Sequence, residues 1–167
     1  GVQLAMMEDA MQTSVFIENM AAFFRYSMVK EDHDTTLEEE LGLVDHYVYI
    51  LDVRFCREVQ YEKKIDSSYL NVKVPRMILQ PIVENAFQYG VRDLDYQGII
   101  ILRVYEKEER VYIEVQDNGK GITKERIDEV MSGKVEVHPR SHHSNGIGIG
   151  NVISRLRLFY GIEDVIQ

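Results

Sequence analysis

The sequence predicts an α/β (α+β) two-layer sandwich, in which helices cover one face of a mixed sheet and two further helices precede the sheet. Three observations lead to this prediction. Apolar residues recur every three or four positions through residues 4–57, which is the spacing of amphipathic helices. Residues 59–65 then alternate apolar and polar side chains like a strand, and residues 98–106 and 110–116 form two further strand-like runs. Helix-like segments lie between and after these strands, so they can form the second layer.

A polar stretch separates the two N-terminal helices. Residues 4–29 carry an apolar stripe rich in Met and Phe, which is typical of helix packing within or between chains. The sequence KEDHDTT (30–36) interrupts this stripe. Thr36, followed three residues later by Glu39, is a capping-box pattern that predicts a second helix, and the apolar face of that helix continues to about Arg57.

The elements after the first strand follow from apolar patterns and turn residues. Pro75 opens a third helix that runs to Phe87, and Pro81 within it indicates either a late start or a kink. Charged residues between the two later strands predict a hairpin. The remaining expected elements are a short helix at 123–132, a loop at 133–145, a helix at 148–160 and the beginning of a strand at Val165–Ile166.

Composition limits the classes of protein that fit. The chain has 167 residues, 45% apolar and 28% charged, which suits one compact domain with or without an appendage. The formal net charge of −9 argues against nucleic acid as a partner, and a bound nucleotide would need a divalent cation beside it. Cys56 has no second cysteine for a disulfide, and no apolar run is long enough to cross a bilayer. The start at Gly1 indicates a piece of a longer protein.

Three glycines stand on alternate positions at the start of the last predicted helix: Gly146, Gly148 and Gly150. Backbone N–H groups and the dipole at a helix N-terminus bind anions, and glycine removes the side chain that would block a phosphate. The alternative interpretation is a flexible hinge. The dinucleotide fingerprint and the P-loop do not fit, because no strand precedes this stretch and no Gly-Lys-Ser/Thr follows it.

A second glycine-rich stretch, VQDNGKGI (115–122), follows the predicted hairpin. Asn118-Gly119 is a common hairpin turn, which is one interpretation. Against it, the segment after Gly121 is helix-like, so a turn here would not join two strands. In the other interpretation, Asp117 accepts a hydrogen bond from an exocyclic amine, and the two glycines let a flat ring approach the backbone.

Polar side chains interrupt the third predicted helix, LQPIVENAFQYG (79–90). Asn85 and Gln88 lie one turn apart on the same face, and Tyr89 is four positions after Asn85. An asparagine in an apolar helix is disfavoured unless its amide has a partner, so a hydrogen-bonded boundary group is one interpretation. The other is a Mg²⁺ ligand, because an amide carbonyl suits a Mg²⁺ ion that keeps waters and phosphate oxygens.

In this order the three stretches resemble the ATP-binding domain, of the Bergerat fold, that histidine kinases share with gyrase-type topoisomerases, heat-shock chaperones and the mismatch-repair protein MutL. LQPIVENAFQYG resembles its N box, DNGKGI its first glycine box and GIGIGN its second, with residues 132–145 in the place of the ATP lid. A narrower resemblance, to bacterial sensor histidine kinases of the YesM and LytS type, spans roughly residues 15–167. It rests on FFRYSM (23–28), TLEEEL (36–41), YVYILDVRF (47–55), PRMILQPIVENA (75–86) and GIGNVISRLRLFYG (148–161).

The resemblance implies a role for each matched residue. Asn85 would hold Mg²⁺ bridged to the phosphates, with Glu84 as the family's acidic residue beside it. Asp117 would bind the adenine amino group. The adenine slot would be shaped by Gly119, Gly121 and Ile122, and the phosphates and lid would be supported by Gly146, Gly148, Gly150 and Asn151.

Two departures from the family pattern bear on the chemistry. Gln88 and Tyr89 stand beside the nucleotide site where the family often has Lys-His, which removes a positive charge near the phosphates. Gyrase-type ATPases carry a water-activating Glu four residues before the Asn, and Pro81 occupies that position here. The resemblance therefore favours phosphoryl transfer over hydrolysis.

The resemblance also implies a division of the chain and a function. Residues 1–57 would be the second dimerisation helix and a connecting helix, and residues 58–167 the ATP-binding catalytic domain, cut before its last strand. With Mg²⁺, this domain would bind ATP and donate the γ-phosphate to a histidine on the dimerisation helices, for relay to a response regulator. The full protein would be a homodimer through these helices. This part would be cytoplasmic, joined to a bacterial membrane sensor through upstream segments.

The family's phosphoacceptor histidine lies in a H-F-x-x-N-T-type stretch. That context is missing around His33, His46, His138, His142 and His143. We therefore expect the chain to bind ATP without labelling itself. Two alternatives remain open: an ATP-hydrolysing conformational switch of the same fold, which Pro81 argues against, and a non-catalytic dimerisation module with a degenerate nucleotide pocket, which Gln88-Tyr89 favours.

Overall fold

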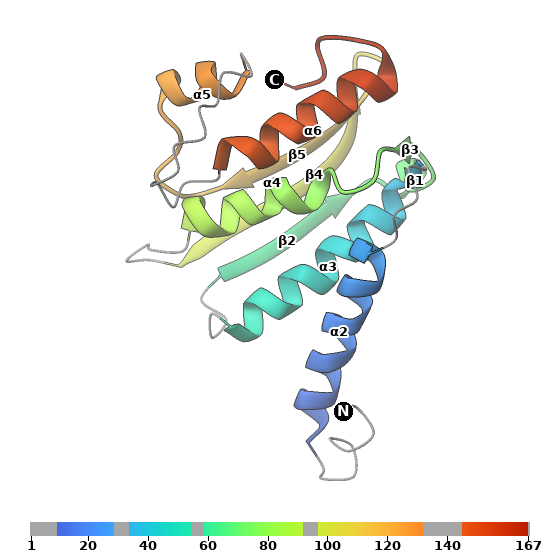
Figure 1. Ribbon diagram of the computed structural model, residues 1–167, viewed down its shortest axis with the longest axis vertical. Coiled ribbons are helices and arrows are strands. Elements are labelled where there is room, and N and C mark those ends of the chain that lie inside the picture. Colours follow the sequence, from blue (N-terminus) through green and yellow to red (C-terminus); the bar gives the residue numbers. More distant parts are fainter. Residues whose placement is uncertain (1–9, 29–33, 55–58, 92–96, 132–144, 167) are drawn as a thin grey trace.

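The computed structural model describes residues 10–28, 34–54, 59–91, 97–131 and 145–166 (Figure 1). The first elements are α2 (Met11–Met28), the short strand β1 (Thr35–Thr36), α3 (Leu37–Arg54) and β2 (Val59–Ile65). Next come the 3-10 turn η1 (Ser67–Tyr69), the short strand β3 (Lys73–Val74), α4 (Leu79–Asn85) and the π-helix η2 (Ala86–Val91). The last elements are β4 (Gly98–Lys107), β5 (Arg110–Asp117), α5 (Lys124–Met131) and α6 (Asn145–Tyr160).

Within the described residues, the main sheet has three strands in the order β2-β4-β5. β2 runs parallel to β4, with Tyr61 opposite Ile100, and β4 runs antiparallel to β5, with Ile100 opposite Asp117. The sheet is therefore mixed, and the predicted first strand and hairpin are confirmed. A second, two-residue pairing of β1 with β3 ties the start of α3 to the segment before α4, and local patterns did not predict it.

Helices cover one face of this sheet. Figure 1 shows α3, α4 and α6 on the same side of it. Alternate side chains of a strand point to opposite faces, and the covered positions of β4 are the buried ones: Gly98, Ile100, Leu102 and Val104. On the other face Arg103 is half-buried and donates hydrogen bonds to Glu114 (3.2 Å) and Gln116 (2.8 Å). The predicted two-layer α+β sandwich is confirmed.

The apolar core lies between the two layers, and α3 contributes to it. One cluster of buried side chains joins α3, α4 and β4; its members include Leu37, Val44, Leu79, Val83, Ile100 and Leu102. Because its buried side chains belong to this core, α3 is part of the sandwich. The division of the chain at residues 57 and 58 stays a prediction.

α2 packs antiparallel to α3, and of this pair α3 is the helix that belongs to the sandwich (Figure 1). The Phe23 ring of α2 stacks on the Tyr47 ring of α3 with 5.6 Å between the ring centroids. At the start of α3, the Thr36 N–H donates to a Glu39 carboxylate oxygen (3.0 Å) and the Glu39 N–H donates to the Thr36 hydroxyl (3.3 Å). The two N-terminal helices and the predicted capping box are confirmed.

The third helix begins at Leu79 and not at Pro75, so the late start is the correct interpretation. Pro81 is the third residue of this helix, where a backbone N–H has no intrahelical acceptor, and the first turn therefore tolerates it. After Asn85 the chain widens into the π-helix η2. The apolar pattern did not predict this change, since a π-turn differs from an α-turn by one residue only.

Two expectations about the C-terminal part were wrong. α6 begins at Asn145, three residues before the predicted start, so the alternating glycines lie inside its first turns. Val165–Ile166 do not form a strand, because the Val165 N–H donates to the Glu163 carbonyl (3.1 Å) in a local turn. The predicted loop, apart from its last residue, falls outside the described part of the chain, as do residues 4–9 and 55–57 of the first two helices.

Candidate functional site

The end of η2 packs directly against the turn that follows β5. A Cβ atom on Gly119 would lie 2.0 Å from the carbonyl oxygen of Gly90, and a Cβ atom on Gly90 would lie 2.7 Å from the carboxylate carbon of Asp117. The contact with backbone excludes a side chain at Gly119, and a side chain at Gly90 would displace the Asp117 carboxylate. The segments 79–90 and 115–122, which are separate in sequence, therefore meet at Asp117.

Asp117 is the last residue of β5, and its position is set by its neighbours. Its Oδ1 accepts a hydrogen bond from the Gly119 N–H (2.9 Å), and the side chain is half-buried. The next residue, Asn118, continues the strand pairing through its side chain: Oδ1 accepts from the Ile99 N–H (2.7 Å) and Nδ2 donates to the Gln97 carbonyl (3.1 Å). Asn118 thus anchors the end of β5 to the start of β4, and the sequence interpretation assigned it no such role.

The polar side chains of α4 and of the start of η2 make two separate sets of hydrogen bonds. The Asn85 Nδ2 donates to the Pro81 carbonyl one turn earlier (2.9 Å), which leaves the Oδ1 carbonyl oxygen to act as an acceptor. The Glu84 carboxylate accepts hydrogen bonds from Gln80 Nε2 (2.9 Å) and from Gln88 Nε2 (3.0 Å). The structure therefore pairs Gln88 with Glu84, a partner that the helical spacing did not predict, and the shared face of Gln88 and Asn85 stays a prediction.

The start of α6 lies against the start of α4. A Cβ atom on Gly148 would lie 3.7 Å from the Cβ of Pro81, which is ordinary contact, and a Cβ atom on Gly150 would meet no atom of the described residues within 4 Å. Packing within the chain therefore does not require glycine at either position. Gly146 lies in the first turn of α6, and Asn151 is exposed.

The remaining predicted residues border the same region. Gly121 has a φ of +72°, a backbone conformation that residues with a side chain rarely adopt. This position therefore favours glycine for conformational reasons. Ile122 follows it and is 63% exposed, although it is a large apolar side chain. The backbone of Tyr89 lies in η2, and its side chain is outside what the structure describes.

The residues of this region suit a bound Mg²⁺ only together with a ligand that brings its own oxygens. Across the described ranges, no three His, Cys, Asp or Glu side chains lie close enough to hold a metal ion. Asn85 offers a neutral carbonyl oxygen, which is a ligand type that Mg²⁺ accepts when phosphates and waters complete the shell. The donor set fits Mg²⁺ that arrives with a phosphate group.

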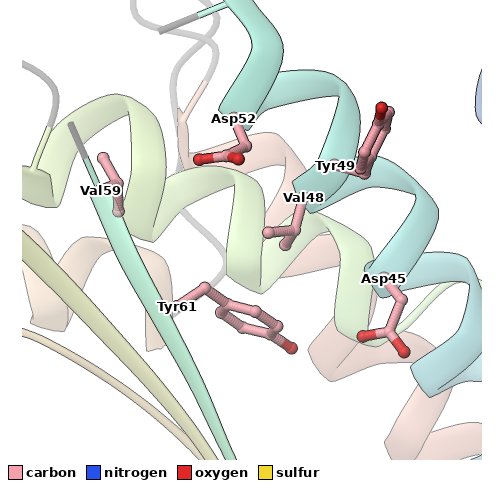
Figure 2. A pocket seen from close by; sticks show the side chains of 6 residues that line it. All are labelled: Asp45, Val48, Tyr49, Asp52, Val59 and Tyr61. Atoms are coloured by element: carbon pink, nitrogen blue, oxygen red, sulfur yellow. The ribbon is translucent and has the colours of Figure 1, made fainter. Parts of the chain in front are cut away.

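A separate hollow of about 300 Å³ lies between α3 and β2 (Figure 2). Its lining is Asp45, Val48, Tyr49, Asp52, Val59 and Tyr61, so it contains none of the predicted site residues. The Tyr61 hydroxyl is buried in it without a hydrogen-bond partner among the described residues. Burial, and secondarily the charge of Asp45, raises the pKa of this hydroxyl. Lys63 already neutralises Asp45 at 2.6 Å, so the hollow offers no unsatisfied charge there.

The structure thus brings together most of the predicted site and adds two residues to it. Gly90 and Asn118 were missed, although both stand inside quoted stretches. A glycine after an apolar helical run is a recognised end signal and could have indicated Gly90. The role of Asn118 depends on its contact with a distant strand, for which spacing carries no signal.

Comparison with known proteins gives two family matches. Residues 2–59 match the family described as histidine kinase, and residues 71–161 match the family described as histidine kinase-, DNA gyrase B-, and HSP90-like ATPase. Across the described part of the chain, no helix combines the length and apolar character that a membrane span needs.

Curated relatives are sensor kinases that are much longer than this chain. Sensor histidine kinase YpdA of Escherichia coli is 31% identical over 146 residues, covering 87% of this chain and 24% of the relative. Sensor protein LytS of Oceanobacillus iheyensis is 27% identical, covering 95% and 27%, and sensor histidine kinase YesM of Bacillus subtilis is 29% identical, covering 95% and 25%. The chain therefore spans about a quarter of the length of these relatives.

Proposed function

Since this chain belongs to the histidine kinase-, DNA gyrase B- and HSP90-like ATPase family, and within it to the sensor histidine kinases of the LytS and YesM type, we propose that it binds Mg-ATP for phosphoryl transfer to a histidine. One observation carries this proposal. Three stretches that are far apart in sequence meet around α4, through the contacts of Gly90 with Gly119, of Gly90 with Asp117 and of Pro81 with Gly148.

In the proposed complex, the adenine ring lies beside the end of β5. Only one Asp117 oxygen is used by the Gly119 N–H, and a carboxylate can accept several more hydrogen bonds, including one from the adenine amine. Gly119 and Gly121 present backbone without a Cβ, which lets a flat ring approach. The exposed apolar side chain of Ile122 would be covered by the ring.

The phosphates would lie at the first turn of α6. The N–H groups of that turn have no intrahelical acceptor, and the helix dipole favours an anion there. Gly146, Gly148 and Gly150 keep this backbone free of side chains, and Asn151 can add a side-chain donor. When bound, Mg²⁺ neutralises phosphate charge, and Asn85 would hold it through Oδ1. Gln88 and Tyr89 are uncharged, whereas the family often has Lys-His at these positions. The cation and the N-terminus of α6 would therefore supply positive charge beside the phosphates.

The proposed reaction is in-line transfer of the γ-phosphoryl group. The bond from the γ-phosphorus to the bridging oxygen breaks, a bond to an imidazole nitrogen forms, and ADP leaves with the electron pair. The residues of this chain position the nucleotide and do not react with it. Glu84 is our candidate for accepting the imidazole proton, and its two glutamine partners would hold it in place. Pro81 stands where a water-activating Glu would favour hydrolysis.

The wider context follows from the family and is equally a proposal. Residues 1–57 would supply the second dimerisation helix and a connecting helix, and residues 58–167 the catalytic domain. The full protein would dimerise through the helices, accept the phosphoryl group on a histidine of that bundle, and pass it to a response regulator. It would work on the cytoplasmic side of a bacterial membrane sensor.

Titration calorimetry with ADP and ATP, with and without Mg²⁺, tests the site on the wild-type chain and on Asp117→Asn. The amide still accepts from the Gly119 N–H, but it loses the charge that strengthens a bond to the adenine amine. We expect affinity to fall about tenfold or more, because a hydrogen bond to a charged group contributes about 1.5–3 kcal/mol. Asp34→Asn, an exposed change before β1, is the matched control and should bind like the wild type.

Each other result has a defined meaning. Unchanged binding in Asp117→Asn would show that Asp117 does not read the adenine. Steady phosphate release by the wild type would indicate the hydrolysing switch. No nucleotide binding by the wild type would overturn the proposed function and support a non-catalytic module.

A further inference from the structure

Glu40 of α3 is fully buried and carries four hydrogen bonds on its carboxylate. Its relative exposure is 0%. The backbone N–H groups of Met77, Ile78 and Leu79 donate to it at 2.7, 2.9 and 3.2 Å, and the Tyr26 hydroxyl donates at 2.8 Å. A buried carboxylate is costly unless it is hydrogen-bonded in this way. Glu40 therefore has a defined binding place, and that place is the N-terminus of α4.

The backbone before α4 is shaped to receive this carboxylate. Met77 has a φ of +58°, a left-handed conformation that is uncommon for a residue with a side chain, and Ile78 returns to the right-handed helical region. Successive residues of opposite hand turn their N–H groups to one point and form an anion-binding nest. Ile78, the N-cap of α4, makes no side-chain capping bond of its own. Glu40 thus caps α4 from another helix.

The same carboxylate connects α4 to α2. Tyr26 is near the end of α2, and burial, partly offset by Thr35 and supported by Glu40, raises the pKa of its hydroxyl to about 12, so it is a neutral donor. The Arg76 guanidinium lies over the Tyr26 ring at 4.0 Å from the centroid and donates to the Tyr26 carbonyl (2.8 Å). From α6, Arg155 donates to the Arg76 carbonyl (2.9 Å).

We propose that Glu40 is a positioning residue for the nucleotide site, which links the position of α2, through the Tyr26 hydroxyl, to the position of α4 with Glu84 and Asn85. This rests on the proposed function, since α4 matters here as the carrier of the magnesium ligand. α4 has seven residues and α-helices are stiff over such a length, so a shift at its N-terminus moves Asn85 as well. The Arg155 contact carries the same shift to α6.

The coupling is tested first without nucleotide. The variants are Tyr26→Phe, which removes one hydroxyl and leaves the nest intact, and Glu40→Gln, which removes the charge. Glu38→Gln, an exposed position in the same turn, is the matched control. The readout is the Asn85 side-chain amide resonance in ¹H–¹⁵N spectra of the full chain. We expect this resonance to shift in Tyr26→Phe and Glu40→Gln and to stay in place in Glu38→Gln. An unchanged resonance in folded Tyr26→Phe would overturn the proposal.

Nucleotide affinity gives the second reading. Coupling between two sites is commonly about 5- to 150-fold, so Mg-ADP should bind at least about fivefold more weakly to Tyr26→Phe than to the wild type or Glu38→Gln. A purely structural role would lower the melting temperature and leave Kd unchanged at a temperature where the variant is folded, which would overturn the proposal. If the wild type binds no Mg-ADP, the proposed function fails, while the Asn85 resonance still decides whether α2 and α4 are coupled.

Discussion

Two glutamates form the turn between β4 and β5, and both have positive φ: 53° at Glu108 and 60° at Glu109. This is the geometry of a type I′ hairpin turn, for which Asn-Gly is the preferred pair. Glutamate is strained in this conformation, whereas glycine lacks the Cβ that causes the strain and asparagine offsets it through local hydrogen bonds of its short polar side chain. Glu108→Asn and Glu109→Gly should therefore each raise the free energy of unfolding by about 0.5–1 kcal/mol.

Urea unfolding of the two single variants and the double variant checks this prediction. Lys107→Gly is the control, because Lys107 is the last residue of a strand and glycine weakens strands. It should destabilise the protein. A loss of stability in Glu109→Gly would contradict the turn geometry.

At the scale of single residues, the sequence predicted where some of the candidate residues lie in the fold. Asp117 at a strand end, with Gly119 and Gly121 after it, stands where the stretch VQDNGKGI placed it. The Glu84 partner of Gln88 was not predicted, because side chains one turn away on both sides are available to it. Gly90 was missed because the reason for it is the Asp117 side chain, twenty-seven positions along the chain. Whether these residues bind nucleotide stays a prediction.

At the scale of elements, two helix glycines allow the effect of alanine on helix stability to be compared with its effect on nucleotide binding. Gly150 in α6 and Gly42 in α3 both have open space where a Cβ would be. Replacing either with alanine should raise the free energy of unfolding by about 1 kcal/mol, because glycine is the poorer helix former by that amount. Of these two variants, only Gly150→Ala should weaken Mg-ADP binding, since Gly150 lies in the turn of α6 directly after the proposed phosphate-binding turn, whereas Gly42 lies in α3.

Thermal unfolding and calorimetry on both variants separate the two effects. Gly42→Ala measures the gain in helix stability alone. If Gly150→Ala gains the same stability and binds Mg-ADP as tightly as the wild type, the glycine does not serve the phosphates.

Local patterns predicted elements whose causes are local. The capping box of α3 and the alternation of β2 depend on residues a few positions apart, and both were found where expected. The start of α4 depends on Glu40, which is thirty-nine residues before Leu79, and β1 pairs with a strand that is equally distant in sequence. No spacing rule contains such contacts. The late start of α4 was open as an alternative only because Pro81 restricts the backbone.

At the scale of the whole molecule, three tyrosine hydroxyls lie in or beside the packed interior: Tyr26 in α2, Tyr47 in α3 and Tyr61 in β2. Burial is the main cause that raises the pKa of each, to about 12 for Tyr26, with Glu84 adding to the effect at Tyr47 and Asp45 at Tyr61. The unfolded chain loses these protons near pH 10. The folded chain holds them to higher pH, so their stabilising effect is complete below about pH 10 and is lost progressively as the pH rises from there to the higher pKa of the folded state, about 12 for Tyr26.

We therefore expect the free energy of unfolding in urea to fall as the pH rises from about 10 towards about 12. Tyr61→Phe tests the cause, because it removes a hydroxyl that has no hydrogen-bond partner among the described residues and keeps the ring in place. Such a change costs no hydrogen bond, so stability at neutral pH should be equal or higher, and the alkaline loss should be smaller. An equal alkaline loss in Tyr61→Phe and the wild type would show that the buried tyrosine is not its source.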